Sequence, residues 1–476
     1  MDIRGRRDVL PLGPRGRARP LRLEFLRQSR LGSAAVLRGA ARAREHGAPV
    51  SRIDVALIGA GNRGRAVFGA YALRHPERMR IVALAEPRGD RRLATAAEHG
   101  LAPERVFTDW RGLLRARPDA HAAIVATGDT EHVEPALAAI AAGYHLLLEK
   151  PIAPQPADCL RVTEAAERAG RILQIGHVLR YTEFYARVHE IVASGRLGRV
   201  AMIDVREHVA YWHMAHSYVR GKFRNRALAA PFLLAKSCHD LDLLAWLAEG
   251  RATRLASFGS LGIYRPELAP PGAAARCGSA CSVQASCPWD AARFYLGPDE
   301  RLARHWPWTD LCADPTRAAR ESALATSDYG RCVFRCDNDV ADHQVVAVEF
   351  DAGLTATLGV HGTASEERRT VRISGSAGEL RGVLQTGVIE VSRHGSLGRE
   401  EIRIESSAFG HSGGDQGLLD HFCEVVAIGA PDRVRASGRV ALESHLLGFA
   451  AERARAERRV IEMEPFRDEV RRSAGL

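Results

Sequence analysis

Lysine is rare in this sequence, so its few positions are the first candidates for acid–base chemistry. The chain has only three lysines, Lys150, Lys222 and Lys236, and its other strongly basic residues are all arginine. Arginine effectively cannot lose its proton, whereas a lysine amine can do so where its surroundings lower its pKa. Lys150 and Lys236 are the two lysines that we single out for proton transfer.

A glycine-rich segment, Gly59-Ala60-Gly61-Asn62-Arg63-Gly64, matches the G-x-G-x-x-G pattern. It follows a predicted strand and opens a predicted helix, which is the context in which this pattern binds a dinucleotide. There the first glycine makes a tight turn, the second admits the pyrophosphate, and the third lets the helix pack closely on the strand. We expect the start of the helix, with Asn62 and Arg63, to face the phosphates.

An acidic residue at the end of the second predicted strand predicts NAD rather than NADP. Glu86 is placed to hydrogen-bond the ribose hydroxyls of the adenosine and to repel a 2′-phosphate. Arg88, Arg91 and Arg92 follow directly, and an arginine there would accept that phosphate, so the pattern also allows NADP. Thr127 and Glu149, near the ends of later predicted strands, are expected at the cofactor as well.

Alternating strands and helices must position these residues. Short apolar runs at residues 53–58, 81–85, 122–125, 145–149 and 172–175 predict strands, and residues 131–142 predict one of the helices between them. This alternation is typical of right-handed βαβ units in a doubly wound parallel sheet. Such sheets bind ligands at the carboxyl ends of their strands. Lys150, directly after the fifth strand, is therefore expected beside the nicotinamide.

The pattern changes after residue 176. Longer runs at residues 200–205, 345–350, 355–360 and 371–374 predict an open, largely antiparallel sheet with one covered face. Residues 237–247, 418–428 and 439–458 predict helices. The fold class is thus α/β. We expect a leader at residues 1–50, a Rossmann domain at 51–176, a second α/β domain at 177–460 with an insertion at about 264–341, and a tail at 461–476.

A segment dense in aromatic and hydrogen-bonding side chains predicts a sugar-binding loop. It comprises Tyr211, Trp212, His213, His216, Ser217 and Tyr218. An aromatic platform with nearby donors suits a sugar, although plain aromatic packing would give the same pattern. Arg180, Tyr181, His411 and Asp415 are weaker candidates for the same pocket. Asp242 is a further candidate for substrate contact.

The insertion carries most of the nine cysteines. Cys277, Cys281 and Cys287 lie close together, and Cys332 and Cys336 follow much later. Four thiolates suit zinc or an iron–sulfur cluster, but the spacing is looser than the usual paired C-x2-C. Without a signal peptide, disulfides are disfavoured. The interpretation that we carry forward is one structural metal, with unligated thiols as the alternative.

The leader holds most of the positive charge. Residues 1–50 contain 12 arginines against four acidic residues, so most of the net charge of +10 lies there. The body of the chain gives no electrostatic case for nucleic acid. No stretch reaches the length and apolarity of a membrane-spanning helix. We expect a cytoplasmic protein and a leader that lies outside the fold.

Taken together, these motifs resemble the Gfo/Idh/MocA family of NAD(P)-dependent oxidoreductases. The resemblance rests on Gly59–Gly64, on Glu149-Lys150-Pro151, on Gly176-x-x-x-Arg180-Tyr181 and on His239-x-x-Asp242. It implies a Rossmann domain followed by an α/β domain whose open sheet often forms oligomer contacts, hence a homo-oligomer. It also implies that Lys150 and His239 are the catalytic pair.

The sequence departs from the family pattern beside His239. Such enzymes commonly carry aspartate four residues before the histidine, where this chain has Ala235 followed by Lys236. On a helix, Lys236, His239 and Asp240 would share one face, and Asp242 would lie one turn beyond His239. The substitution leaves open which groups orient the imidazole.

The expected function is hydride transfer from a hydroxyl of a sugar, sugar derivative or cyclitol to NAD, in carbohydrate metabolism. Oxidising an alcohol needs a base for the O–H proton and an acceptor for the hydride, which the nicotinamide provides. Two alternatives stay open. One is a glycosidase that oxidises its substrate transiently with bound NAD, and the other is a non-catalytic sensor of NAD(H).

Overall fold

The computed structural model describes residues 52–278, 280–405 and 411–476. The predicted leader at residues 1–50 lies outside the described residues. No helix in the described ranges is long and apolar enough to cross a membrane.

The N-terminal part of the described chain forms a six-stranded parallel sheet. Its strand order, β3-β2-β1-β4-β5-β6, is that of a doubly wound dinucleotide-binding fold. The strands are β1 (Ile53–Ile58), β2 (Met79–Ala85), β3 (Val106–Phe107), β4 (Ala122–Val125), β5 (His145–Leu148) and β6 (Leu173–Ile175). All of β4 is buried, as expected for an apolar strand covered on both faces. The predicted Rossmann sheet is therefore confirmed.

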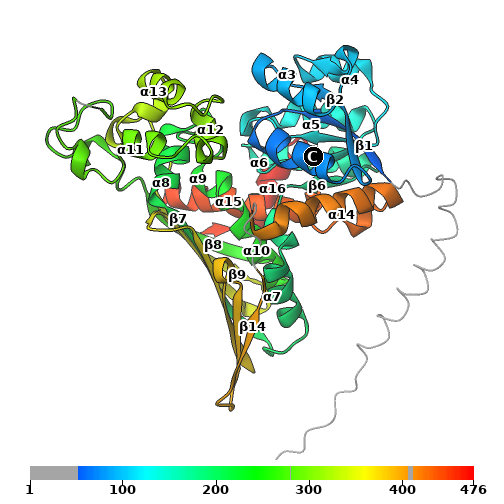
Figure 1. Cartoon of the computed structure of the whole chain (residues 1–476). Coiled ribbons are helices and arrows are strands. Elements are labelled where there is room, and N and C mark those ends of the chain that lie inside the picture. The colour runs from blue at the N-terminus through cyan, green and yellow to red at the C-terminus, as the bar shows by residue number, and fades with distance from the viewer. Residues whose placement is uncertain (1–51, 279, 406–410) are drawn as a thin grey trace, which may run out of the picture. The chain divides into compact units, whose positions relative to one another are not determined.

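Helices connect these strands in the order that the alternation predicted. They are η1 (Asn62–Gly69), α2 (Ala70–Arg74), α3 (Gly89–Glu98), α4 (Trp110–Ala116), α5 (Val133–Ala141) and α6 (Pro156–Arg168). A helix from the far end of the sequence, α14 (Gly414–Ile428), completes the cover of one face (Figure 1). Its Leu418 and Phe422 share a buried cluster with Ile53 and Val55 of β1. Sequence spacing alone cannot predict such a long-range contact.

The second sheet has nine strands in the order β14-β13-β12-β11-β7-β10-β9-β8-β15. It is antiparallel apart from the central pair of β7 and β10, which is parallel. The strands are β7 (Val200–Ala210), β8 (Ala252–Ser260), β9 (His343–Phe350), β10 (Thr355–Ala364), β11 (Arg368–Gly375), β12 (Gly378–Val383), β13 (Val388–Arg393), β14 (Arg399–Arg403) and β15 (Ile461–Glu462). The expected open, largely antiparallel sheet is confirmed.

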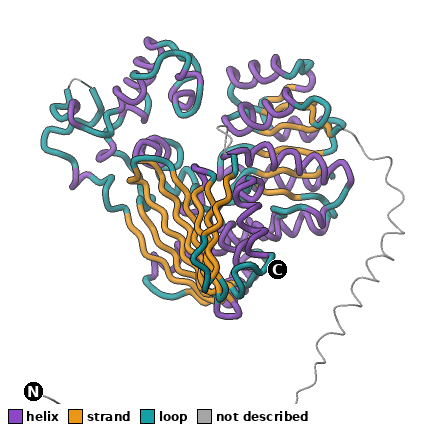
Figure 2. The backbone as a smooth tube through the Cα atoms, turned by 60° about the horizontal axis from the view of Figure 1, so that its bottom comes forward, coloured by secondary structure: helices purple, strands orange, loops and turns teal. Residues whose placement is uncertain are grey.

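Helices lie on one face of this sheet and leave the other face open (Figure 2). They are α7 (Glu183–Ala193), α10 (Cys238–Ala248), α15 (Gly438–Glu457) and α16 (Met463–Ser473). In β9, Val346 and Val348 are buried, whereas Val345 and Ala347, which alternate with them, are exposed. This two-residue period is the pattern of a strand covered on one side.

Residues between β8 and β9 form the insertion that the sequence analysis marked out. It contains only short helices, namely η6 (Pro266–Leu268), η7 (Gln284–Ser286), α11 (Ala291–Leu296), η8 (Leu302–Arg304), α12 (Trp308–Leu311), α13 (Arg317–Thr326), η9 (Asp328–Gly330) and η10 (Val333–Arg335). Its own cluster of buried apolar residues is small, with Ala291, Tyr295, Leu311 and Leu324 as its members. The insertion therefore has little core of its own.

Two parts of the sheet differ from the sequence-based expectation. Residues 461–476, expected as a tail, form β15 and α16, and Phe466 and Val470 of α16 are buried. Few apolar positions among many charged ones made this helix hard to recognise. The outer strands β12 to β14 were not expected, because glycine takes two of the buried positions of β12 and four of the five residues of β14 are charged.

Candidate active site

The glycine loop has the geometry that a bound pyrophosphate needs. Gly59 adopts φ +91°, and a Cβ there would lie 2.6 Å from the carbonyl oxygen of Ala126. A Cβ on Gly64 would lie 1.9 Å from the carbonyl oxygen of Gly59, so the helix can pack here only with glycine. A Cβ on Gly61 would instead meet nothing closer than Arg91 Nη1 at 3.7 Å. The residues present thus fit a dinucleotide over Gly61.

Glu86 lies against this loop at the end of β2. Its Oε2 accepts a hydrogen bond from the Ala60 N–H at 2.7 Å, and its Oε1 accepts one from the Arg88 N–H at 2.9 Å. The guanidinium of Arg88 pairs with Asp90, and that of Arg92 donates to backbone carbonyls. Two of the three arginines that would favour NADP therefore have protein partners.

Lys150 lies at the carboxyl end of β5, as predicted. Its Nζ donates a hydrogen bond to the backbone carbonyl oxygen of Ala235 at 2.7 Å. Ala235 ends α9 (Phe232–Ala235) and is the position at which the family's usual aspartate is missing. A peptide carbonyl, which needs no particular side chain, therefore holds the amine.

His239 lies in the first turn of α10 and is 4% exposed. Burial, followed by the charge of Lys150, lowers the pKa of His239 well below its ordinary value. The imidazole is therefore neutral at neutral pH, and its Nδ1 has no hydrogen-bond partner among the described residues. Lys150 and His239 thus lie close enough for the lysine charge to act on the imidazole, and one buried ring nitrogen of His239 has no partner among the described residues.

One group of potential metal ligands lies at the same place. In the described ranges, His177, Cys238 and His239 are the one set of at least three His, Cys or acidic residues whose ligand atoms all lie within 4.8 Å of one another. Burial lowers the pKa of both histidines and raises the pKa of the Cys238 thiol to about 12, and the charge of Lys150 acts to lower all three. Two neutral imidazoles and one thiolate would leave a divalent ion with a net positive charge beside Lys150, so we assign this set to the candidate catalytic cluster rather than to a metal site.

Arg63 of the glycine loop ties three segments together. Its Nε pairs with Glu149 Oε1 at 2.6 Å, and its Nη2 pairs with Asp415 Oδ1 at 2.7 Å. His411 Nδ1 lies 3.1 Å from the other oxygen of Asp415, and its ring lies 5.8 Å from that of His239. Arg63 and Glu149, predicted to bind the cofactor, thus bind each other and fix the loop beside the candidate catalytic residues.

Arg180 and Asp242, predicted to contact substrate, are buried against each other. Arg180 Nε lies 2.6 Å from Asp242 Oδ2, and Nη2 lies 2.9 Å from Oδ1. Burial acts to raise the pKa of Asp242, but the charge of Arg180 holds it below its usual value. The two side chains are 5% and 1% exposed, and they pack beside the buried His177.

The third predicted catalytic residue, Lys236, belongs to a different cluster. It lies in the turn between α9 and α10, so the expectation that it shares a helix face with His239 is corrected. Its Nζ lies 3.2 Å from Glu207 Oε1 and 3.7 Å from Glu367 Oε2. Burial raises the pKa of Glu207 to about 7, although Arg369 and Lys236 act to lower it. Glu367 also contacts His213 Nδ1, at 2.7 Å.

The predicted sugar loop forms α8 (Tyr211–His213) and η5 (Met214–Arg220), which follow β7. The insertion packs against it. The ring of Trp306 meets that of His213 edge-on at 4.9 Å between centroids, and Phe294 stacks on Trp212 at 5.6 Å. His213 and Trp306 therefore form an aromatic corner near Lys236.

His216 faces into the insertion. It is 1% exposed, its Nδ1 lies 2.6 Å from the Tyr295 hydroxyl, and its Nε2 lies 3.4 Å from Asp310 Oδ2. Tyr329 stacks on its ring at 4.9 Å. Sequence analysis missed the contributions of Trp306 and Asp310. The Trp306-Pro307-Trp308 motif in an unpatterned insertion was the signal that could have revealed them.

The remaining predicted residues have modest contacts. The Thr127 hydroxyl donates to the Glu131 carbonyl at 3.0 Å, Asn62 is exposed at the start of η1, and Tyr211 is half-buried. Tyr181 is buried, and its hydroxyl accepts from the Ala436 N–H at 3.3 Å. Tyr181 therefore supports the fold behind the site.

The fold and the site place this protein in the class of nicotinamide-dependent oxidoreductases. They combine a Rossmann sheet, a glycine loop shaped for a dinucleotide, and a lysine–histidine pair at the carboxyl end of β5. The family model described as oxidoreductase family, NAD-binding Rossmann fold, matches residues 53–177, and that for the GFO/IDH/MocA C-terminal domain matches residues 185–381. Together they span more than half of the chain. The chain belongs to the Gfo/Idh/MocA oxidoreductase family.

Curated relatives and solved structures support the assignment of the chain to this family. The inositol 2-dehydrogenase of Gluconacetobacter diazotrophicus is 34% identical over 199 residues, which are 40% of this chain and 55% of that enzyme. YteT of Bacillus subtilis, named as an oxidoreductase, is 24% identical over 62% of this chain and 70% of its own length. The match to the inositol enzyme thus spans about half of that protein.

Two solved structures illustrate the shared fold. A levoglucosan dehydrogenase in complex with NADH and levoglucosan has a TM-score of 0.65 and 17% identity, covering 87% of this chain and 99% of that one. An aldose-aldose oxidoreductase from Caulobacter crescentus has a TM-score of 0.61 and 18% identity, covering 86% and 99%. At these identities the likeness concerns the fold alone.

Proposed function

We propose that this protein is an NAD-dependent dehydrogenase that oxidises a hydroxyl of a sugar, sugar derivative or cyclitol. The observation that carries the proposal is the meeting of Lys150 and neutral His239 at the carboxyl end of β5, beside the glycine loop. NAD bound at Gly59–Gly64 supplies the hydride acceptor. The protein's own residues must then bind the hydroxyl and remove its proton.

Lys150 is the proton acceptor in this proposal. Its amine is held by the Ala235 carbonyl on one side, which leaves its lone pair, once deprotonated, for the substrate hydroxyl. His239 offers a buried, unpartnered ring nitrogen, so it can orient the same hydroxyl by a hydrogen bond. Arg63 and Asp415 hold the glycine loop and α14 in fixed positions around the pair.

A sugar-like substrate is supported by a wall of side chains around Lys236, which directly follows Ala235, the residue whose carbonyl holds Lys150. His213 and Trp306 provide aromatic faces, and Lys236 with Glu367 provides charged hydrogen-bonding groups. Sugars combine apolar C–H faces with many hydroxyls, which such a wall can bind. The names of the relatives, inositol 2-dehydrogenase and levoglucosan dehydrogenase, support the same substrate class.

We propose NAD rather than NADP because the Glu86 carboxylate lies where the adenosine ribose is expected. A carboxylate there hydrogen-bonds ribose hydroxyls and repels a 2′-phosphate. Arg88 and Arg92, which could override it, already have protein partners.

The test is to incubate the purified chain with a panel of sugars, inositols and glycosides and either NAD or NADP, and to record NADH or NADPH formation. We expect stoichiometric NADH with at least one polyol and a clear preference for NAD. Release of an aglycone without net NADH would instead identify a glycosidase that recycles bound NAD. NAD binding without turnover of any member would favour a sensor, and tighter NADP binding would overturn the role of Glu86.

A further inference from the structure

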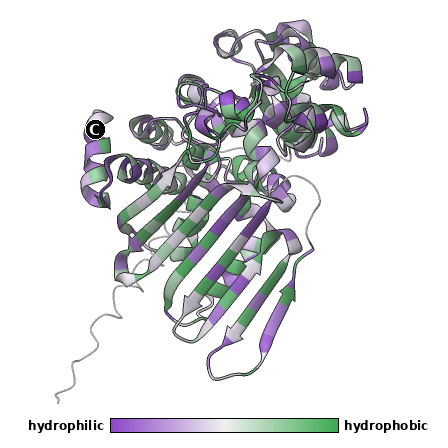
Figure 3. Cartoon of the chain, turned by 90° about the vertical axis from the view of Figure 1, so that its left-hand side faces the viewer, coloured by the Kyte–Doolittle hydropathy of each residue, from purple (hydrophilic) through white to green (hydrophobic). Residues whose placement is uncertain are grey.

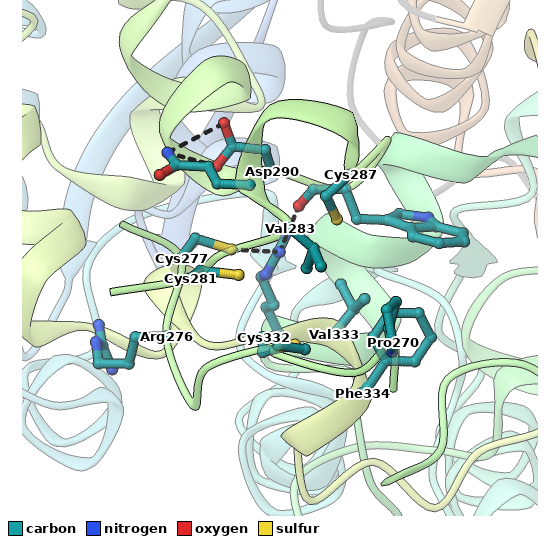
Figure 4. A pocket seen from close by; sticks show the side chains of 14 residues that line it. Pro270, Arg276, Cys277, Cys281, Val283, Cys287, Asp290, Cys332, Val333 and Phe334 are labelled. Carbon is teal, nitrogen blue, oxygen red and sulfur yellow. Dashed lines mark hydrogen bonds between the residues drawn. The ribbon is translucent and has the colours of Figure 1, made fainter. Parts of the chain in front are cut away.

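We propose that Cys277, Cys281, Cys287 and Cys332 bind one zinc ion that holds the insertion together. The four side chains line one small cavity of about 20 Å³ (Figure 4). A cavity of this size has room for one ion, because about 10–15 Å³ already holds one water. Thiolates are the ligands that zinc prefers in closed structural sites. The proposal is independent of the enzymatic function.

The backbone brings these cysteines together from two distant segments. The Cys277 N–H donates to the Gly330 carbonyl at 2.9 Å, and the Cys332 N–H donates to the Ala275 carbonyl at 2.9 Å. These bonds pair the two segments as a short antiparallel bridge beside the cavity. The Cys287 N–H in turn donates to the Val283 carbonyl at 3.1 Å, which returns that part of the loop to the same cavity.

A buried arginine at the cavity lacks a negative partner. Arg220, 3% exposed, lines the cavity, and its Nη2 lies 3.6 Å from Cys277 Sγ. Its other hydrogen bonds go to the carbonyls of Trp289 and Arg331, and no carboxylate in the described part of the chain lies within 4.0 Å of it. A buried charge is costly unless it is paired.

Zinc bound by four cysteines would supply the missing charge. Each thiol gives up its proton to the solvent on binding, so Zn²⁺ with four thiolates carries a net charge of −2. That charge faces the Arg220 guanidinium, which can donate hydrogen bonds to a thiolate sulfur. Neutral thiols would leave the arginine buried without a counter-charge.

The insertion also has little apolar core to stabilise it. Its own buried cluster is small and its helices are short, and a structural metal contributes folding free energy to such segments directly. No three of its sulfur atoms lie within 4.8 Å of one another in the described chain, so the side chains must rotate to close the site. None of the nine cysteines forms a disulfide in the structure.

The first experiment is elemental analysis of the full-length protein purified without added metal, with a parallel count of free thiols in denaturant. We expect about one zinc per chain and nine free thiols after chelation. Replacement of zinc by cobalt should give the intense sulfur-to-cobalt absorption of a tetrahedral thiolate site. A metal-free protein of unchanged stability, a disulfide among these cysteines, or iron with sulfide would each overturn the proposal.

Matched serine variants test which cysteines bind. Cys287→Ser should lose most of the zinc, whereas Cys312→Ser, in the same insertion but outside the cavity, should retain it. Cys336→Ser should also retain it, because Cys336 does not line the cavity and its thiol donates to the Cys332 carbonyl. Loss of zinc in Cys336→Ser, or full zinc in Cys287→Ser, would overturn this ligand set. The wild-type measurements decide the proposal even if a variant fails to fold.

Discussion

Lys150 carries the most specific prediction at the scale of single residues. Lys150→Met removes the titrating amine, so kcat should fall by about two to four orders of magnitude, the usual effect of losing a positioned acid–base group. Lys150→Arg should fail almost as badly, because arginine stays protonated. NAD affinity should persist in both variants, since the glycine loop is separate. Steady-state kinetics and NAD titration measure these effects.

The exposed Lys222 offers a matched control for that experiment. Its ammonium lies over the Phe223 ring and is not among the charges that act on the His239 imidazole, so Lys222→Met should retain wild-type kcat. Near-normal turnover in Lys150→Arg would mean that Lys150 acts through its charge, and His239 would then become the leading base.

At the scale of elements, the insertion forms one wall of the proposed sugar site. Trp306 is half-buried against His213, so Trp306→Ala should raise KM for the sugar about 3- to 10-fold through the loss of aromatic contact. The value of kcat and the affinity for NAD should change little. Steady-state kinetics at saturating NAD measure KM and kcat for the sugar.

Two further variants show whether the aromatic ring itself matters. Trp306→Phe should recover most of the affinity, because it keeps an aromatic face. Leu302→Ala alters an exposed residue of the same insertion and should leave KM unchanged. An unchanged KM in Trp306→Ala would remove the insertion from the substrate site.

At the scale of the whole molecule, we expect the open face of the nine-stranded sheet to mediate self-association. Figure 3 shows apolar and polar bands alternating across this sheet. Phe258, 76% exposed, lies opposite Val345, 44% exposed, on neighbouring strands of that face. Phe258→Glu should shift the protein toward monomer, because it places a charge in the proposed contact. Sedimentation velocity at several concentrations checks this outcome.

Leu397 serves as the control for the assembly experiment. It is fully exposed between β13 and β14 and lies outside the paired strands, so Leu397→Glu should leave the oligomeric state unchanged. A monomeric wild-type protein, or an unaltered assembly in Phe258→Glu, would contradict the expectation.

Local spacing in the sequence determined the Rossmann sheet, the glycine loop and the position of Lys150. The reason is that each depends on residues near one another along the chain. Gly59 and Gly64 constrain a single turn, and the apolar run of β5 places Lys150 at a strand end. The alternation of short strands and helices likewise favours one sheet topology.

Only the tertiary structure decided which groups surround those residues. Asp415 reaches Arg63 because α14 packs on β1, and Ala235 supplies a carbonyl to Lys150 because α9 lies beside β5. Arg180 likewise proves to be the partner of Asp242. Contacts of this kind join residues far apart in the chain. They depend on how whole elements pack against one another, which the spacing of residues along the chain does not predict.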